Sequence, residues 1–294
     1  MSLTRRRFLT ITSAACLASP AAARTQWSGR ALGAGASIVL RGHNSDHALN
    51  AAKDTIRRME KLFSLYDANS ALSRLNRVGT LEMPPEFATL MGLVDKMHAA
   101  TEGLFDPTIQ PLWTALAKAG DIDAARRLIG WKDVRHDSGT ISFEKSGMAM
   151  TLNGIAQGFA TDRVKATLAA YGFDNVIVNI GEYAVGGEPA TLGVADAKGA
   201  PIQVLELQNE AVATSSPRAL RLSDNASHIL HPRAHAPDPI WDTVSVVAPT
   251  ATIADALSTA LVVAPNMVLA RALRQSGLAR LIVLKERNAK ASIL

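Results

Sequence analysis

Residues 151–162, TLNGIAQGFATD, join a predicted strand at residues 148–152 to a predicted helix that ends near Gly172. Gly154 and Gly158 lie four residues apart at this junction, where glycine permits a sharp turn and a close backbone approach. A helix N-terminus also offers N–H groups and a positive dipole end to a phosphate. On this stretch alone two interpretations stay open: ordinary turn chemistry between a strand and a helix, or a phosphate-binding floor.

The N-terminal residues are typical of an export signal. Residues 4–9, TRRRFL, precede an apolar run at residues 11–17 and small residues at 20–23, which together match the three parts of a signal peptide. The apolar run is too short to cross a bilayer. The paired arginines before Phe-Leu resemble a twin-arginine signal, with a general secretory signal as the alternative. We therefore predict a signal peptide at residues 1–23, one mature domain at 24–294 and a periplasmic location.

The composition of the mature part excludes several classes of chemistry. Cys16 is the only cysteine and lies in the leader, so the mature chain has no disulfide or thiolate chemistry. Its length of about 270 residues is enough to bury a core without them. The net charge of +5 falls to +2 once Arg5, Arg6 and Arg7 leave with the leader, which holds no acidic residue. No basic–aromatic interleaving is present, so nucleic-acid binding is not expected.

The order of elements favours an α+β fold, because strands and helices follow one another without strict β–α–β alternation. A long helix is expected after Ser45, with the apolar positions Leu49, Ala52, Ile56, Met59 and Phe63 on one face, ending near Tyr66. The other expected elements are a strand at 33–40, helices after Ser70, Pro84 and Asp121, a hairpin over 131–145, strands at 175–181, 204–207, 211–216 and 243–247, a turn-rich segment at 181–187, helices at 253–264 and 265–275, and a strand at 281–285.

Residues 254–261, ADALSTAL, carry the second informative pattern. Asp255 and Thr259 are four residues apart and share one face of the predicted helix. They offer two hard oxygen ligands, and magnesium takes one or two carboxylates while water and phosphate oxygens complete its octahedron. The alternative is a surface aspartate beside a back-bonding threonine. The apolar surroundings favour burial, where a bound cation offsets the cost of the carboxylate charge.

Three of the seven histidines, His228, His231 and His235, lie close together in the sequence. Pro232 interrupts any helix that would align them, and the mature chain has no cysteine, so a zinc site is not favoured. Two roles remain for one of these histidines. It is an acid–base group beside a phosphate or nucleophile, or an ordinary loop histidine held by hydrogen bonds.

Two segments of the first half hold candidate binding residues. Tyr66, one of three tyrosines, is either a half-buried loop anchor or a contact for a planar ligand. In the sequence Asp106-Pro107-Thr108, the aspartate is expected to accept hydrogen bonds from nearby backbone N–H groups in a turn. An aspartate in that role stabilises the turn and need not contact a ligand.

Seven segments, taken in chain order, resemble the ApbE family of FAD:protein FMN transferases. The resemblance covers nearly the whole mature chain and rests on the order of the motifs, each of which is weak alone. The segments are residues 63–66 with 70–76, 103–112, 154–162, 179–181, 213–215, 228–233 and 254–261. The form LNGIAQG at residues 152–158 resembles the branch associated with nitrous-oxide reduction, the NosX-like proteins.

The resemblance implies a fold and a reaction. The fold would be a single T-fold-related α+β domain of mixed, mainly antiparallel sheets packed with helices. The reaction would be Mg²⁺-dependent transfer of FMN from FAD to a threonine or serine hydroxyl, with release of AMP. The implied partner is an exported or membrane flavoprotein of a membrane electron-transfer complex, such as one serving nitrous-oxide respiration. The enzyme itself would be peripheral to the membrane at most.

The family's roles carry over motif by motif. Asp255, Thr259 and the backbone carbonyl near Ala156 would bind the metal, and His228 would be the acid–base group near the acceptor hydroxyl. The FAD site would be lined by Tyr66, Asp106, Thr108 and Thr214, with Gly154, Gln157 and Gly158 as the floor under the pyrophosphate and metal.

The sequence also departs from the family pattern. Thr151 and Gln157 stand where Asp and Lys are frequent, so a positive charge near the phosphates is missing and more of the neutralisation falls on the metal. Residues 231–235, HPRAH, replace the usual Asp-Pro-Arg-Thr-Gly, and residues 181–183, GEY, replace Gly-Gly-Asp. Two alternatives therefore accompany the transferase: a non-catalytic flavin-binding or flavin-delivery protein, and an enzyme that hydrolyses FAD to FMN and AMP.

Overall fold

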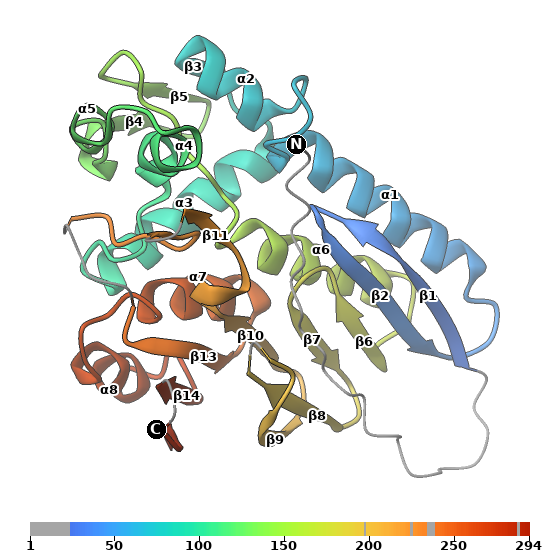
Figure 1. Cartoon of the computed structure of the whole chain (residues 1–294). Coiled ribbons are helices and arrows are strands. Elements are labelled where there is room, and N and C mark those ends of the chain that lie inside the picture. Colours follow the sequence, from blue (N-terminus) through green and yellow to red (C-terminus); the bar gives the residue numbers. More distant parts are fainter. Residues whose placement is uncertain (1–23, 197, 224–225, 234–238, 287–288) are drawn as a thin grey trace.

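The described chain is built on an eight-stranded sheet with the order β1-β2-β6-β7-β10-β13-β14-β15 (Figure 1). The computed structural model describes residues 24–196, 198–223, 226–233, 239–286 and 289–294. The predicted signal peptide and His235 therefore lie outside the described residues. The strands are β1 (Arg24–Ala31), β2 (Ala34–Arg41), β6 (Val176–Asn179), β7 (Tyr183–Gly186), β10 (Ala211–Ser215), β13 (Trp241–Ala248), β14 (Leu281–Glu286) and β15 (Ala291–Ile293).

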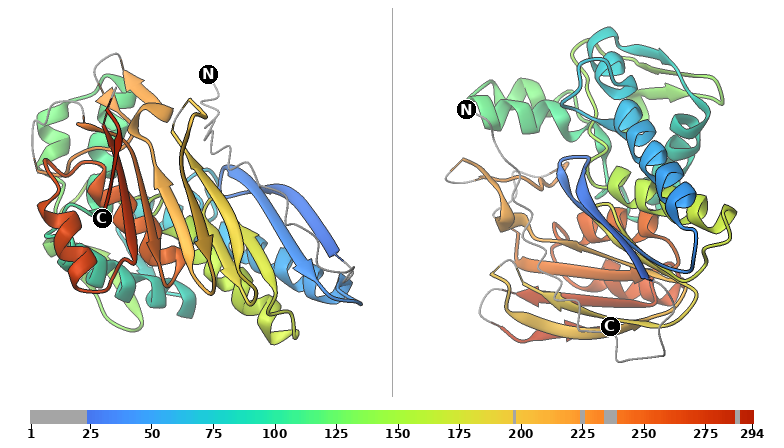
Figure 2. Two further views of the ribbon diagram at one scale, coloured as in Figure 1. Left: turned by 90° about the horizontal axis from the view of Figure 1, so that it is seen from below. Right: turned by 90° about the vertical axis from the view of Figure 1, so that its right-hand side faces the viewer.

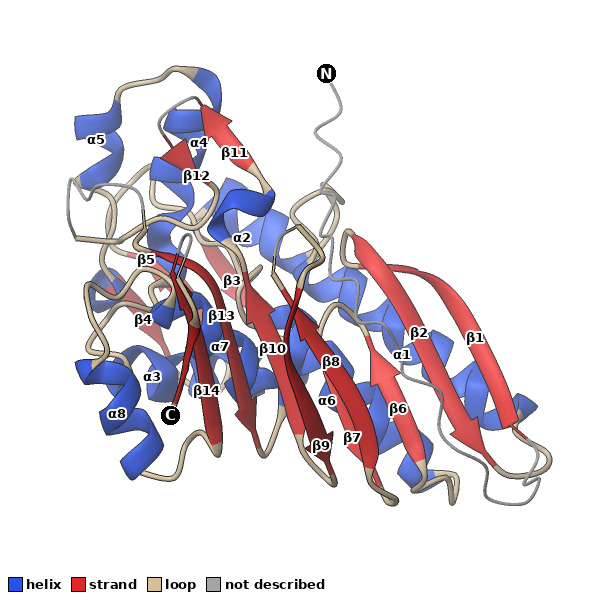
Figure 3. Cartoon of the chain, turned by 60° about the horizontal axis from the view of Figure 1, so that its bottom comes forward, coloured by secondary structure: helices blue, strands red, loops and turns tan. Residues whose placement is uncertain are grey.

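Helices cover one face of this sheet and a hairpin covers part of the other (Figures 2 and 3). Helix α1 (Asp46–Phe63) packs on α6 (Ala156–Ala170), α6 packs on β6 and β7, and α7 (Ala251–Leu261) packs on β10 and β13. Helix α8 (Val268–Gln275) contacts β14. On the opposite face, the hairpin of β8 (Ala190–Ala195) and β9 (Pro201–Leu207) closes a separate apolar cluster over β7, β10 and β13.

A second layer of short elements lies beyond the helices, at the upper left of Figure 1. Its three-stranded sheet has the order β3-β5-β4, and the β11–β12 hairpin contacts α4. The elements are α2 (Ala71–Val78), β3 (Thr80–Glu82), α3 (Pro85–Ala100), η1 (Pro107–Ile109), α4 (Gln110–Lys118), α5 (Ile122–Arg126), η2 (Trp131–Asp133), β4 (Val134–His136), β5 (Thr140–Phe143), η3 (Pro217–Ala219), β11 (Arg221–Ser223) and β12 (Ala226–Ser227).

The predicted α+β class is confirmed, and every strand pairing among the described residues is antiparallel. The apolar face predicted for α1 is buried in full, because residues spaced three and four apart project from one side of a helix. That helix ends at Phe63 rather than near Tyr66. The caps at Ser70 and Asp121 are also confirmed, since each side chain accepts a hydrogen bond from a first-turn N–H group.

Two sequence-based assignments are wrong. Residues 148–152 form no strand, because the side chain of Asn76 takes the place of a strand partner for Met150: it accepts from the Met150 N–H and donates to the Met150 carbonyl at 2.8 Å each. The turn-rich segment at 181–187 contains strand β7, whose pairing with β6 and β10 supplies the backbone hydrogen bonds. Strands β1 and β8 were not predicted either, since their polar and glycine-containing sequences lack a strong alternation.

The glycine at position 158 is required by space and not by backbone conformation. Gly158 does not have a positive φ. A Cβ atom built on it would stand only 2.2 Å from the carbonyl oxygen of Ala251, so the first turns of α6 and α7 touch through their backbones. The first interpretation of the 151–162 stretch, simple turn chemistry, therefore does not describe its second glycine.

Gly158→Ala is expected to lower the free energy of unfolding by about 1–3 kcal/mol, because a backbone carbonyl cannot yield to the new methyl group without separating the two helices. Denaturant titration followed by circular dichroism measures the change. Gly92→Ala is the matched control. Gly92 is an exposed glycine within α3 with no heavy atom within 4 Å of its Cβ position, so this variant gains up to about 1 kcal/mol. Equal stabilities for the two variants would contradict the close approach.

Candidate active site

Four segments far apart in the sequence enclose a cavity of about 630 Å³. The first segment leads from the end of α3 into α4, and the second is the extended segment before α6. The third follows β12, and the fourth is α7, through Thr259. The lining residues are Leu104, Phe105, Asp106, Pro107, Ile109, Trp113, Thr151, Asn153, Gly154, His228, Ile229, Leu230 and Thr259. The cavity thus combines an apolar wall with a carboxylate, an imidazole and two hydroxyl groups.

Asp106 holds the first wall in shape. Its Oδ1 accepts hydrogen bonds from the N–H of Thr108 at 2.9 Å and from the Thr108 hydroxyl at 2.6 Å, and its Oδ2 accepts from the N–H of Trp131 at 3.3 Å. Thr108 is fully buried behind the wall, where its Oγ1 accepts from the N–H of Gly130 at 2.8 Å. The predicted turn at Asp106 is therefore confirmed. Asp106 lines the cavity, whereas Thr108 supports it from behind.

The ring of His228 is oriented by two backbone carbonyls. Its Nδ1 lies 2.9 Å from the carbonyl oxygen of Leu220 and 3.2 Å from that of Pro217. Carbonyl oxygens only accept hydrogen bonds, so Nδ1 carries the proton of the neutral ring and Nε2 carries the lone pair. A histidine held in this tautomer at the wall of a cavity is equipped to take a proton from a bound hydroxyl group.

The segment after His228 is tied to the loop that follows α3. The Arg233 guanidinium donates to the carbonyl of Glu102, and the Arg233 N–H donates to Nδ1 of His231 at 3.1 Å. Burial, together with Arg233 and Arg126, lowers the pKa of His231 below its usual range, which keeps this ring neutral and able to accept. The altered residues 231–233 thus form an ordered turn. Among the described residues no group of three His, Cys, Asp or Glu side chains is placed to hold a metal ion.

The candidate metal ligands meet where α6 approaches α7. Asp255 is almost fully buried, at 1% exposure, and its Oδ2 accepts from the N–H of Gly158 at 3.1 Å. Thr259 stands one turn later and reaches the cavity. A Cβ atom on Gly154 would come within 2.9 Å of the Thr259 hydroxyl oxygen, so only glycine allows this contact. Ala156 begins α6 between the two glycines, which places its carbonyl in the same neighbourhood.

This donor set fits magnesium. It consists of a buried carboxylate, a hydroxyl and a backbone carbonyl, all hard oxygen donors, beside an open cavity in which water and phosphate oxygens can complete an octahedron.

A second buried carboxylate, Asp162, holds α7 from the side of α6. Its oxygens accept from the N–H groups of Ala251 and Thr252 at 2.9 Å each and from the Thr252 hydroxyl at 2.5 Å. Burial raises the pKa of Asp162 above the usual value, although these donors act in the opposite direction. The donors belong to the first turn of α7, where the helix dipole also favours a negative charge.

Of the residues predicted for the site, Asp106, Gly154, His228 and Thr259 line this cavity. Gln157, Thr214 and Tyr66 do not line it and make their contacts elsewhere. Gln157 is 3% exposed, and its Nε2 donates to the carbonyl of Leu32 at 3.2 Å. Thr214 is buried against Ser245, with 2.8 Å between the two hydroxyl oxygens. Tyr66 is 67% exposed beside the β1–β2 turn.

Gln157 lies next to a second pocket, through its contact with Gly181. This second pocket of about 630 Å³ is lined by Ala34, Gly35, Asn179 and Gly181, among others. A Cβ atom on Gly181 would clash with the Gln157 side chain at 2.6 Å, so Gln157 forms the layer beneath Gly181. The lining residues of this second pocket were not predicted, because most are small and carry no reactive group.

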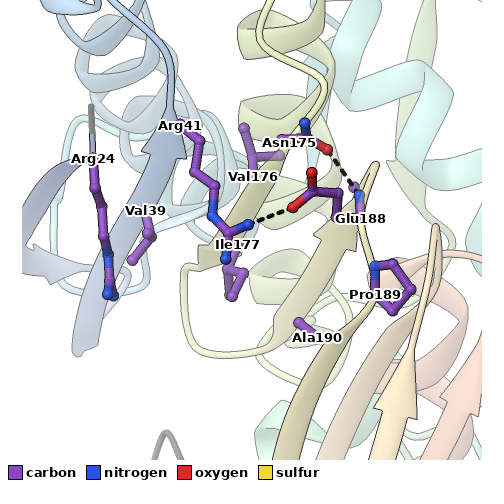
Figure 4. A pocket seen from close by; sticks show the side chains of 10 residues that line it. Arg24, Val39, Arg41, Asn175, Val176, Ile177, Glu188, Pro189 and Ala190 are labelled. Atoms are coloured by element: carbon purple, nitrogen blue, oxygen red, sulfur yellow. Dashed lines mark hydrogen bonds and ion pairs between the residues drawn. The ribbon is translucent and has the colours of Figure 1, made fainter. Parts of the chain in front are cut away.

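A third pocket lies at the other end of the sheet (Figure 4). An ion pair between Arg41 and Glu188 spans it, and the N–H of Glu188 donates to the Asn175 side chain at 2.8 Å. Arg41 ends β2 and Val176 begins β6, whereas Ala34 and Asn179, at the opposite ends of these strands, line the second pocket. None of the residues that line the third pocket lines the cavity at His228. This pocket is therefore separate from the candidate active site.

Comparison with known proteins gives one consistent result. The model of the ApbE family matches residues 32–282. The chain is 28% identical over 226 residues to an FAD:protein FMN transferase of Chlamydia muridarum, covering 69% of this chain and 71% of that protein. It is 25% identical to one of Klebsiella pneumoniae, covering 93% and 88%.

Solved structures show the same fold. The ApbE protein of Thermotoga maritima superposes with a TM-score of 0.82 at 24% identity, covering 92% of this chain and 96% of that one. The flavin transferase ApbE of Vibrio cholerae superposes with a TM-score of 0.79 at 20% identity, covering 93% and 97%.

Asp162→Ala is expected to lower the free energy of unfolding by about 1–3 kcal/mol, because it leaves buried N–H donors at the start of α7 without an acceptor. Thermal unfolding measures the loss, and metal binding should weaken with it, since α7 carries Asp255 and Thr259. Asp121→Ala removes the cap of the exposed helix α5 and is the control; it costs about 1 kcal/mol and leaves metal binding unchanged. If the Asp162→Ala variant were as stable as the wild type, the conclusion that Asp162 holds α7 in place would be wrong.

Proposed function

Because the chain belongs to the ApbE family, whose model matches residues 32–282, we propose that it is an FAD:protein FMN transferase. The enzyme moves the FMN half of FAD onto a threonine or serine hydroxyl of an acceptor protein and releases AMP. The names of the relatives support this activity, since those of Chlamydia muridarum and Klebsiella pneumoniae are FAD:protein FMN transferases. The fold agrees with those of the flavin transferase ApbE of Vibrio cholerae and the ApbE protein of Thermotoga maritima.

One observation carries the proposal: His228 and Thr259 line the same cavity, and Asp255 is held one turn from Thr259. Phosphoryl transfer needs a group that takes the proton from the attacking hydroxyl and a means of stabilising charge on the phosphoryl oxygens. The residues that can meet these two requirements line one cavity or, for Asp255, lie one helical turn from a residue that lines it.

The reaction is a displacement at phosphorus. The acceptor hydroxyl oxygen bonds to the phosphorus of the FMN half, the bond from that phosphorus to the bridging oxygen breaks, and AMP leaves with the bridging oxygen and its electron pair. His228 takes the hydroxyl proton at Nε2, and the carbonyls of Pro217 and Leu220 stabilise the resulting imidazolium through Nδ1–H. Asp255, Thr259 and the Ala156 carbonyl would hold magnesium, which would supply electrostatic stabilisation of the phosphoryl oxygens.

The substrate is expected to bridge the two hollows. The cavity at His228 is apolar on one side, with Phe105, Trp113 and Leu230, which suits an aromatic ring. The predicted roles of Tyr66, Gln157 and Thr214 in FAD binding stay predictions. Their positions around the second pocket and its Gly181 rim are compatible with contacts to a long dinucleotide.

We further propose that the enzyme works outside the cytoplasm on a membrane flavoprotein. The support is the twin-arginine-like leader at residues 1–23, which lies outside the described residues. No helix in the described part of the chain is long and apolar enough to cross a bilayer. The NosX-like form of residues 152–158 suggests an acceptor that serves nitrous-oxide respiration.

Incubating residues 24–294 with FAD, Mg²⁺ and a candidate acceptor, followed by mass spectrometry, tests the function. A transferase adds the mass of FMN to the acceptor and releases AMP in equal amount. FAD hydrolysis gives FMN and AMP without modified acceptor. Stoichiometric FAD binding with no turnover, for every exported flavoprotein tried, marks a non-catalytic binding protein.

Asp255→Ala is expected to abolish Mg²⁺-dependent transfer, because it removes the single carboxylate of the metal site. Labelled FMN on the acceptor is the measurement, with Asp121→Ala as the control for loss of an aspartate. Full activity of the Asp255→Ala enzyme over a range of Mg²⁺ concentrations would exclude this metal assignment.

His228→Gln is expected to reduce the transfer rate about 10²–10⁴-fold, the usual contribution of a positioned general base, while FAD binding stays near that of the wild type. Rates measured from pH 5 to 9 (roughly the span over which histidine titrates) should lose their dependence on a basic group in the variant. A loss of FAD affinity that accounts for the whole effect would assign His228 to substrate binding instead.

A further inference from the structure

A chain of buried hydroxyl groups leads from the backbone of α7 to the candidate metal ligand Thr259. Ser215, at the end of β10, is 5% exposed, and Ser258 is 1% exposed. The Oγ atoms of these two serines are 2.9 Å apart. Ser215 Oγ also lies 3.5 Å from Thr259 Oγ1, and Ser258 Oγ donates to the Asp255 carbonyl oxygen at 3.1 Å.

The donor and the acceptor in each contact of this chain can be assigned by starting from the contact between Ser258 and the Asp255 carbonyl. A hydroxyl group has one hydrogen to donate, and that of Ser258 goes to the Asp255 carbonyl, which only accepts. In the arrangement that satisfies this contact with the Asp255 carbonyl, Ser258 accepts from Ser215. Ser215, having donated its hydrogen to Ser258, can only accept from Thr259. The hydrogen of Thr259 accordingly points into the protein, toward Ser215.

This orientation is not the usual one for a threonine in a helix. Such a hydroxyl commonly donates to the carbonyl oxygen four residues earlier, which for Thr259 is that of Asp255. Here Ser258 donates to that oxygen. Among the described residues, Ser215 is the hydrogen-bond partner of the Thr259 hydroxyl. The separation of 3.5 Å is long for two hydroxyl groups, so the contact adds little stability and mainly sets a direction.

We propose that Ser215 is a positioning residue for the metal site: it turns the Thr259 hydroxyl so that the oxygen lone pairs, and not the hydrogen, face the bound cation. A neutral hydroxyl binds a cation through its lone pairs, and a hydrogen aimed at the ion opposes binding. This inference rests on the metal assignment in the proposed function. It adds a residue from a different element, 44 positions away in the sequence, whose effect is exerted through Thr259.

Other buried hydroxyl pairs in the same part of the sheet do not reach α7. Thr214 pairs with Ser245 at 2.8 Å, and Ser216 pairs with Thr243 at 3.2 Å. These contacts join β10 and its extension to β13. Ser215 alternates with its two neighbours along the strand and so projects to the opposite face, toward α7. The neighbouring Ser216 is therefore a matched control for the loss of one hydroxyl group.

Ser215→Ala is expected to weaken Mg²⁺ binding about 10–100-fold, as is typical when a group that orients a metal ligand is removed. Isothermal titration calorimetry of the protein without FAD measures the Mg²⁺ dissociation constant. The Mg²⁺ concentration for half-maximal FMN transfer should rise by the same factor, while the rate at saturating Mg²⁺ approaches that of the wild type. The Tm without Mg²⁺ should change little, and the increase in Tm on adding Mg²⁺ should shrink.

Three further variants and the wild-type protein distinguish the possible outcomes. Ser216→Ala should keep the wild-type Mg²⁺ affinity, and Asp255→Ala should lose it. If Asp255→Ala loses Mg²⁺ binding while Ser215→Ala binds like the wild type, the positioning role is overturned and the transferase stands. If wild-type protein transfers FMN without binding Mg²⁺, the metal assignment fails and the role of Ser215 fails with it. If Ser215→Ala does not fold, Ser258→Ala is the test variant, because it removes the acceptor that fixes the position of the Ser215 hydrogen. This variant should also bind Mg²⁺ more weakly than the wild type. Wild-type Mg²⁺ affinity in Ser258→Ala would overturn the proposal.

Discussion

Two carboxylate contacts exchanged between α6 and α7 hold the functional part of this protein together. Asp255 of α7 accepts from the N–H of Gly158 in α6, and Asp162 of α6 accepts from the N–H groups of Ala251 and Thr252 in α7. Each helix therefore binds a carboxylate of the other near its own N-terminus, where unpaired N–H groups and the helix dipole stabilise negative charge. The exchange requires the helix backbones to touch, which explains the glycine at position 158.

Burying these two carboxylate charges costs electrostatic free energy. Asp162 and Asp255 are both buried, and burial raises the pKa of Asp162 even with its donors in place. A divalent cation beside Asp255 would lower that cost by supplying the opposite charge. The absence of a lysine at position 157 fits this balance. Gln157 is buried and bonded to Leu32, so in this chain the charge compensation would fall on the proposed cation and not on that side chain.

The large sheet supplies the other walls of the site. Strand β10 ends at Ser215 below α7, and the chain then passes through η3 to the hairpin that presents His228. The carbonyls of Pro217 and Leu220 orient the His228 ring. The small second layer closes the cavity from above with Phe105 and Asp106. The proposed proton acceptor, the candidate metal ligands and the apolar wall thus come from separate parts of one fold.

The sequence by itself determined the features that depend on neighbours within one or two turns of chain. These are the buried face of α1, the caps at Ser70 and Asp121, the Asp106 turn, the pairing of Asp255 with Thr259 on one helical face, and the order of motifs that indicates the family. Only the tertiary structure decided which polar groups meet. The hydrogen-bond partner of a buried side chain is set by contacts between distant elements, so no local pattern predicts that Gln157 turns to Leu32, that Asn76 replaces a strand partner for Met150, or that Ser215 meets Thr259.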